Sequence, residues 1–217
     1  MALKLYDYWR SSAAYRLRIA LQIKGVDFDP VQIDLHPAIK QHLSDAYRAL
    51  NPQMRVPAIE LNGEVIGQST AILEWIEETW PDPALLPGSA NDRALVRGWS
   101  AAIGCDIHPV QNLRILKAAA AIDGSGLDGM KAWANRWITT GLEGLEALVA
   151  DHRRSSDFLF GDTPGMAEVY LVPQLYNARR WGVDLAPFPT LSRADAAARA
   201  LPAFAEAEPE RQPDAES

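Results

Sequence analysis

The stretch that decides the fold reads Tyr8-Trp9-Arg10-Ser11-Ser12-Ala13-Ala14-Tyr15-Arg16-Leu17-Arg18-Ile19-Ala20-Leu21. It follows an apolar segment, Leu3–Tyr8, that is typical of a β-strand, and its serines begin a helix. A serine at a helix start accepts a hydrogen bond from a backbone N–H that has no partner inside the helix. The remaining N–H groups and the helix dipole attract negative charge. The junction at Ser11 is therefore either an ordinary helix cap or a site for an anion such as a thiolate, with Arg10 beside it.

Composition places the chain among globular proteins: 48% of its 217 residues are hydrophobic and 23% are charged. The net charge of −7, from 21 Lys and Arg against 28 Asp and Glu, argues against binding to nucleic acid or to a membrane surface. Cys105 is the only cysteine, so no intrachain disulfide can form, which fits a reducing compartment. We find no pattern of a signal peptide or a membrane span and expect a cytoplasmic location.

The first part of the chain mixes strand and helix signals in the order βαβ–αββα, which predicts an α/β domain. Asn62-Gly63 between two short apolar runs indicates a hairpin turn, because both central positions of that turn need a positive φ. The expected strands are Leu3–Tyr8, Phe28–Leu35, Ala58–Leu61 and Glu64–Gly67. The expected helices are Ser12–Lys24, His42–Leu50 and Ser69–Trp80.

The proline-rich segment Pro81–Gly88 reads as a linker, and only helical periods follow it. The expected helices are Asn91–Cys105, Pro109–Ala121, Leu127–Ala150, Met166–Trp181 and Pro189–Ala200. The last segment, Pro202–Ser217, is acidic and contains prolines, so we expect it to fray.

Two apparent motifs carry no site by themselves. Gly124–Gly129 matches the dinucleotide-binding pattern G-x-G-x-x-G, but it follows an alanine-rich helix and not a strand, so we interpret it as an interhelix loop. Cys105 and His108 are spaced to share one helical face, but a zinc site needs three or four ligands, and we predict no metal. His108 alone is either an ordinary histidine or a site residue.

Gln68-Ser69, at the second strand-to-helix junction, repeats the pattern at Ser11 and has the same two readings, a cap or an anion site. Exposed arginine usually belongs to a solvated face. The three arginines Arg10, Arg114 and Arg180 could nevertheless bind two carboxylates in bidentate fashion.

Taken together, these motifs resemble the zeta class of the cytosolic glutathione transferase superfamily. The resemblance rests on the runs Ser11–Arg18, Asn51–Pro57, Gln68–Trp75, Gly104–Pro109, Gly161–Pro164 and Ala178–Arg180, and it covers nearly the whole chain. It implies a thioredoxin-like glutathione-binding domain in residues 1–84, an all-helical substrate-binding domain in residues 90–217, and a homodimer.

The resemblance also implies which residues hold glutathione. Ser11 is expected to stabilise the thiolate, with Ser12 as the alternative, because Ala13 stands where zeta enzymes often carry cysteine. Gln68 and Ser69 are expected at the γ-glutamyl end. The remaining expected contacts are the Val56 backbone, held by a cis Pro57, at the cysteinyl part, and His42 and Gln53 near the glycine carboxylate.

The activity implied by the resemblance is glutathione-dependent cis–trans isomerisation of a maleyl diacid, such as maleylpyruvate to fumarylpyruvate. Arg10, Arg114 and Arg180 are expected to bind the substrate carboxylates, and His108 either orients the substrate or relays a proton. The alternatives are isomerisation of maleylacetoacetate, conjugation of small electrophiles such as halogenated acids, and a glutathione-fold binding module without catalysis.

Overall fold

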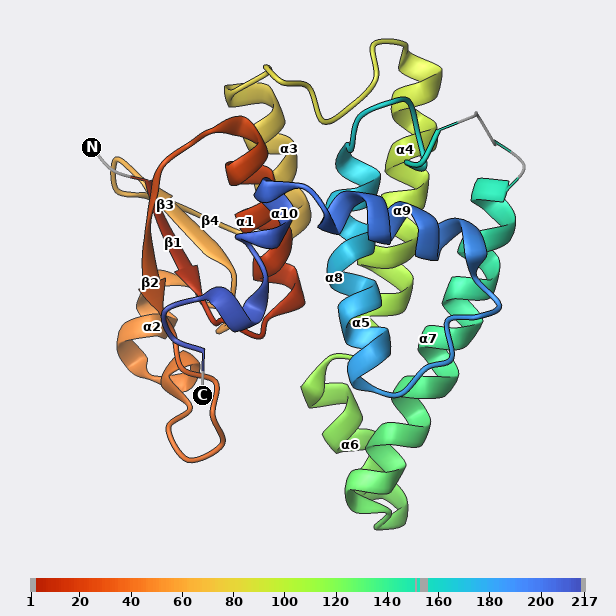
Figure 1. Ribbon diagram of the computed structural model, residues 1–217. Helices are drawn as coiled ribbons and strands as arrows, with labels where there is room; N and C mark the ends of the chain where they lie inside the picture. The colour runs from red at the N-terminus through yellow and green to blue at the C-terminus, as the bar shows by residue number, and fades with distance from the viewer. Residues whose placement is uncertain (1–2, 151, 153–155, 216–217) are drawn as a thin grey trace. The chain divides into compact units, whose positions relative to one another are not determined.

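The computed structural model describes residues 3–150, 152 and 156–215 (Figure 1). Its contacts divide the chain into two units. The first unit comprises Met1–Leu85 together with Leu201–Ser217, and the second comprises Leu86–Ala200. The α/β half and the helical half expected from the sequence correspond to these units, except at the C-terminus.

The first unit is built on a mixed four-stranded sheet with the strand order β2-β1-β3-β4. Its strands are β1 (Leu3–Asp7), β2 (Phe28–Gln32), β3 (Ala58–Leu61) and β4 (Glu64–Gly67). β1 pairs in parallel with β2 and antiparallel with β3, and β3 pairs antiparallel with β4. This arrangement confirms the predicted βαβ–αββα order, although the second strand ends at Gln32 and not at Leu35.

Helices of this unit follow the strands in chain order: α1 (Ser12–Lys24), α2 (Asp45–Leu50) and α3 (Ser69–Thr79). Because side chains alternate along a strand, Tyr6 and its partner Ala58 share one sheet face, where they pack in a cluster with Tyr47 of α2. The predicted helix His42–Leu50 is split into a 3₁₀ turn, Gln41–Leu43, and α2, because Ser44 caps α2.

The second unit is helical throughout its regular structure. Its elements are α4 (Ala90–Ala101), a π-helical segment (Ala102–Ile107), α5 (His108–Val110), α6 (Leu113–Asp123), α7 (Gly126–Ala150), α8 (Met166–Arg180) and α9 (Pro189–Arg199). α8 is the central helix, buried from Met166 to Leu175. The predicted helix Pro109–Ala121 is in fact two helices, since Asn112 caps α6 with its side chain.

The π-helical segment packs closely on α7 at a glycine. A Cβ atom on Gly141 would lie 2.3 Å from Cγ1 of Ile107 and 2.7 Å from its Cδ1. Only glycine leaves room for Ile107 there, and Ile107 directly precedes His108. Gly141 therefore fixes where the chain enters α5.

The C-terminal segment corrects the expectation that it frays. Phe204 of α10 (Pro202–Ala205) is fully buried, Ala207 is buried, and the segment packs against α1 of the first unit (Figure 1). Residues 201–215 therefore belong by their contacts to the first unit, although the sequence grouped them with the helical domain.

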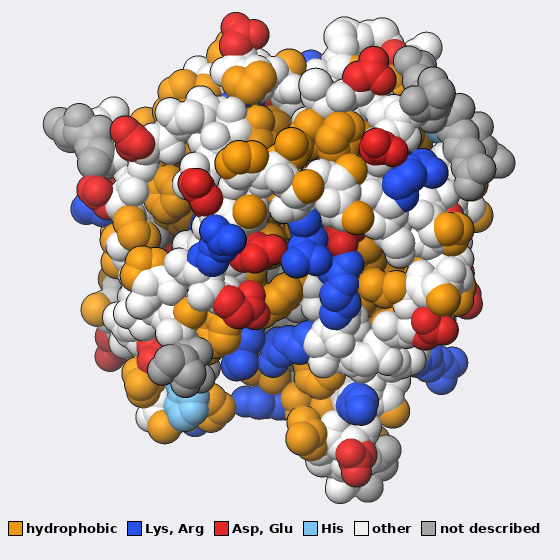
Figure 2. Space-filling model, viewed as in Figure 1, with side chains coloured by type: hydrophobic (Ala, Val, Ile, Leu, Met, Phe, Trp, Pro, Cys, Tyr) orange, Lys and Arg blue, Asp and Glu red, His pale blue; other side chains and the backbone are white. Residues whose placement is uncertain are grey.

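Among the described residues, none of the helices has the length and apolarity needed to cross a membrane. On the face seen in Figure 2, acidic and basic side chains are interspersed with hydrophobic ones. Neither sign of charge forms an unbroken field over the part of this face that the structure describes.

Candidate functional site

Ser11 caps α1 in the manner predicted from the sequence. Its Oγ accepts a hydrogen bond from Ala14 N at 3.2 Å, and its backbone has the extended conformation of an N-cap. The hydroxyl proton of a serine that accepts in this way can still be donated. α1 carries no acidic residue in its first turn, so no side chain there offsets the positive end of the helix dipole. Ser12 is buried directly behind Ser11.

α3 begins differently from α1, because its N-cap is Gln68, which makes no side-chain cap hydrogen bond, so the reading of Ser69 as a helix cap is wrong. Ser69 is buried, and its Oγ accepts from Nη1 of Arg16 at 3.3 Å. The first turn of α3 contains no acidic residue. Arg16, which is 2% exposed, thus brings a guanidinium from α1 to the start of α3. A helix N-terminus with a guanidinium at its base favours a carboxylate ligand.

Two further candidates, Gln53 and Gln68, are brought together by the fold. Gln68 Nε2 donates to Gln53 Oε1 at 2.6 Å, and both side chains are exposed. Gln68 has a φ of 69°, a conformation that costs free energy in a non-glycine residue and is typical of functional sites. Its side chain and Ser69 therefore leave the same turn at the start of α3.

Val56 and Pro57 lie directly before β3, and the Val56–Pro57 peptide bond is cis. The preceding carbonyl, that of Arg55, accepts from Tyr47 Oη at 2.7 Å and from Asn51 Nδ2 at 2.8 Å. Burial raises the pKa of Tyr47 to about 12, so the phenol stays a neutral donor. The backbone that leads into Val56 is therefore held from two sides.

His42 lies in the 3₁₀ turn, and its Nδ1 is buried with no hydrogen-bond partner among the residues that the structure describes. Arg10 is partly exposed, and its guanidinium lies over the indole of Trp9 at 4.9 Å. Both residues belong to the first unit, but no described contact joins them to Gln53, Gln68 or Ser69.

The remaining candidates lie in the second unit. His108 is half-buried at the start of α5, and Arg114 is exposed in the first turn of α6. Arg180 is exposed at the C-terminal end of α8, with its guanidinium 5.3 Å from the indole of Trp181. Its neighbour Arg179 forms an ion pair with the buried Asp195.

A buried amide pair joins the two segments that carry these candidates. Gln111, between His108 and Arg114, donates through Nε2 to Oε1 of Gln174 in α8 at 2.6 Å. Both glutamines are buried. The pair therefore fixes the α5–α6 segment to the helix that ends in Arg180.

Sequence reasoning missed the charged residues inside the first unit. Arg16 and Arg18 are among its largest fully buried side chains, and Arg18 forms a 2.7 Å ion pair with the buried Asp7. The signal was present in the run Tyr15-Arg16-Leu17-Arg18, because two arginines interrupt an otherwise apolar helix. Their partners could not be found from spacing alone.

The described residues of the first unit fit glutathione, an anionic tripeptide with a thiol. Ser11 offers a donor at one helix start, the start of α3 with Arg16 suits a carboxylate, and the chain before β3 is extended toward a cis-proline. The exposed guanidiniums of the second unit suit a carboxylate substrate.

Comparison with known proteins gives matches along nearly the whole chain. The family model of the glutathione S-transferase N-terminal domain matches residues 1–78, and that of the C-terminal domain matches residues 131–211. Maleylpyruvate isomerase of Ralstonia sp. is 46% identical over 212 residues, which are 98% of this chain and 99% of that protein.

Solved structures agree with these matches. A holo structure of maleylpyruvate isomerase, described as a bacterial glutathione S-transferase of the zeta class, has a TM-score of 0.94 and 46% identity. The match covers 98% of this chain and 100% of that one. A maleylacetoacetate isomerase from Anaeromyxobacter dehalogenans, with glutathione bound in its active site, has a TM-score of 0.87 and 42% identity. That match covers 99% of this chain and 98% of the other.

Proposed function

The chain belongs to the glutathione S-transferase family, and we propose that it is a glutathione-dependent cis–trans isomerase that converts maleylpyruvate to fumarylpyruvate. The observation that carries the proposal is that α1, which begins after Ser11, and α3, which begins at Ser69, both lack an acidic residue in the first turn. The buried Arg16 of α1 also donates to Ser69 at the start of α3. The similarity to maleylpyruvate isomerase over the full length supports the choice of reaction.

Glutathione, when bound, supplies a thiolate whose reversible addition to the double bond leaves a single bond that can rotate. Ser11 donates its hydroxyl proton to the sulfur, and the first backbone N–H groups of α1 add to the stabilisation of the negative charge. This lowers the pKa of the thiol, which is about 8.5 in free cysteine. Ser12 is the alternative donor.

The peptide is held by the other first-unit residues. Gln68 and Ser69 bind the γ-glutamyl carboxylate, which Arg16 attracts from beneath. The Val56 backbone, with Pro57 next to it, pairs with the cysteinyl part, and His42 and Gln53 lie toward the glycine carboxylate.

Arginines bind the substrate. Arg10, Arg114 and Arg180 bind its two carboxylates and the negative charge that develops on the neighbouring carbonyl in the transition state. His108 orients the substrate or relays a proton. This set of guanidiniums suits a dianion and is of little use for an apolar electrophile, which favours isomerisation over general conjugation.

The test is a comparison of substrates and cofactor. Purified protein is given maleylpyruvate or maleylacetoacetate, each with and without glutathione, and the trans product is quantified. We expect turnover of maleylpyruvate only when glutathione is present. Equal rates without glutathione would refute the cofactor role, and a higher kcat/KM for maleylacetoacetate would assign the chain to that substrate, as the similarity to a maleylacetoacetate isomerase allows.

We also propose that the chain works as a cytoplasmic homodimer, as the resemblance to the zeta class implies. Sedimentation equilibrium tests the dimer, and cell fractionation tests the location.

A further inference from the structure

The C-terminal segment, residues 201–215, returns to the first unit and lies beside the loop that leads into α1. Its turns are held internally by Gln212, whose Nε2 donates to the carbonyls of Glu206 at 3.0 Å and Glu208 at 2.8 Å. Phe204 and Ala207 bury their side chains in the same unit. The segment is thus a folded part of this unit, close to the residues proposed to bind glutathione.

Arg18 connects this segment to the loop. Its guanidinium is almost fully buried, and it donates through Nε to Ala207 O at 3.0 Å and through Nη2 to Trp9 O at 2.9 Å. Its Nη1 forms the 2.7 Å ion pair with Asp7. One side chain therefore joins the end of β1, the loop and the C-terminal segment.

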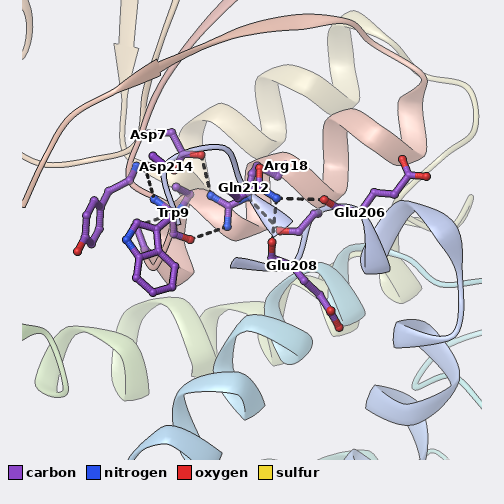
Figure 3. A network of polar contacts seen from close by, with 11 residues as sticks. Asp7, Trp9, Arg18, Glu206, Glu208, Gln212 and Asp214 are labelled. Atoms are coloured by element: carbon purple, nitrogen blue, oxygen red, sulfur yellow. Dashed lines mark hydrogen bonds and ion pairs between the residues drawn. The ribbon is translucent and has the colours of Figure 1, made fainter. Parts of the chain in front are cut away.

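Asp214 makes a second connection at the same place. Its Oδ2 accepts from Trp9 N at 3.0 Å, while the carbonyl of Trp9 is held by Arg18 (Figure 3). The backbone of Trp9 is therefore tied on both sides, directly to the C-terminal segment through its N–H and through Arg18 by its carbonyl. The next two residues are Arg10 and Ser11, and Ser11 N donates to Tyr8 O at 2.8 Å.

We infer that the C-terminal segment positions the Trp9–Ser11 loop, and that Asp214 and Arg18 are positioning residues for the anion site at the start of α1. The identity of the anion, the glutathione thiolate, rests on the proposed function, whereas the attachment of the loop does not. Asp214 acts through the backbone of Trp9 and touches no substrate. Because Ser11 lies two residues beyond that backbone, releasing Trp9 N–H changes where the Ser11 hydroxyl points.

The test compares two carboxylates of the same segment. Asp214→Ala removes the acceptor of Trp9 N–H, and Asp214→Asn keeps an acceptor oxygen. Glu206→Ala is the control, since it changes the net charge equally but removes a side chain on the exposed side of the segment. Hydrogen–deuterium exchange is measured over residues 9–14 without ligand, and the pKa of bound glutathione is measured from its thiolate absorbance.

We expect exchange at Trp9 to rise about tenfold in Asp214→Ala, as for the loss of one hydrogen bond to a charged group, and the bound-thiol pKa to rise with it. Asp214→Asn should restore most of both values, and Glu206→Ala should leave both unchanged. Exchange and thiol pKa that are the same in Asp214→Ala as in Glu206→Ala would overturn the inference. If Asp214→Ala fails to fold, Gln212→Ala, which loosens the same segment, must give the same two changes or the inference fails.

The failure of the proposed function looks different. A wild-type protein that isomerises neither maleyl diacid, but whose loop exchange responds to Asp214→Ala, would refute the function and support the positioning role. If the wild type is active but exchange in its Trp9–Ser11 loop is unchanged by Asp214→Ala, the proposed function is supported and the positioning role is refuted.

Discussion

Asp7 in the first unit and Glu168 in the second are both buried carboxyl groups, but their partners differ. Asp7 faces a guanidinium, with its Oδ2 2.7 Å from Arg18 Nη1. Glu168 accepts from two backbone N–H groups, those of Leu159 at 2.7 Å and Gly165 at 2.8 Å. Burial raises the pKa of both, the Arg18 charge offsets part of the rise in Asp7, and the pKa of Glu168 reaches about 7.

This difference teaches how each unit uses charge. The first unit places cations inside, at Arg16 and Arg18, where they fix the backbone and the start of α3. The second unit keeps an interior carboxyl that can take up a proton, and its candidate substrate-binding cations, Arg114 and Arg180, are exposed. Interior charge therefore shapes the first unit, and surface charge at helix ends is what the second unit offers to a ligand.

The largest effect is expected from breaking the interior pair of the first unit. Arg18→Met leaves Asp7 buried without its counter-charge, which costs about 3–5 kcal/mol of the free energy of unfolding. Urea unfolding measures the change. Arg48→Met is the matched control, because Arg48 and Asp45 form a 3.3 Å pair whose side chains are 55% and 98% exposed. The control should lose less than about 1 kcal/mol, and equal losses in the two variants would contradict the comparison.

A pH-dependent stability is expected from the carboxyl of the second unit. Between about pH 4.5, the ordinary pKa of a glutamate, and about pH 7, the folded state holds a proton on Glu168 that the unfolded state has released. The free energy of unfolding therefore falls as the pH rises through this range, by up to about 3 kcal/mol, and this contribution is constant above it.

Glu168→Gln removes the titrating group and should flatten this part of the profile, measured as urea midpoints from pH 4.5 to 7.5. Glu143→Gln, at an exposed position of α7, is the control and should keep the wild-type slope. A wild-type slope in Glu168→Gln would show that another group is responsible.

Local signals in the sequence predicted several elements to the residue. α1, β3 and β4 have the expected bounds, because Ser11 caps α1, Gly25 ends it at a φ of 64°, and Asn62-Gly63 makes the hairpin turn. In each case the deciding residues lie within the element or next to it. Such boundaries can be found without knowing the tertiary structure.

Tertiary contacts decided what the sequence missed. The C-terminal segment is held by Arg18, which donates to Ala207 O from 189 residues earlier in the chain. Because this partner is so distant in the sequence, the acidic and proline-containing composition of the segment could not show that it packs on the first unit. A helical pattern read from the sequence alone assigns arginine to an exposed face. Arg16 and Arg18 are buried instead, because their partners lie elsewhere in the chain. For the site, the sequence supplied Ser69 and Gln68 as candidates but could not show that Arg16 lies beneath Ser69.

The exposed cations of the second unit offer the next test. Arg114→Ala should lower kcat/KM for maleylpyruvate by about 10- to 100-fold, because a guanidinium that binds a carboxylate in the transition state is lost. The affinity for glutathione, measured by calorimetry, should not change, since Arg114 lies in the unit proposed to bind substrate. Arg193→Ala, at an exposed position of α9, is the control. Unchanged turnover in Arg114→Ala would remove Arg114 from the site.

The smallest expected effect separates the two roles of Ser11. Ser11→Ala should raise the pKa of bound glutathione by about one unit, close to 1.4 kcal/mol, while the backbone N–H groups of α1 remain. It should also cost about 1 kcal/mol of stability, because Ala14 N loses its acceptor. Ser89→Ala removes an equivalent cap, whose Oγ accepts from Asp92 N at 3.1 Å, and should show the stability loss alone. If the thiol pKa is the same in both variants, Ser11 is only a helix cap, and thiolate stabilisation belongs to Ser12 or to the backbone N–H groups.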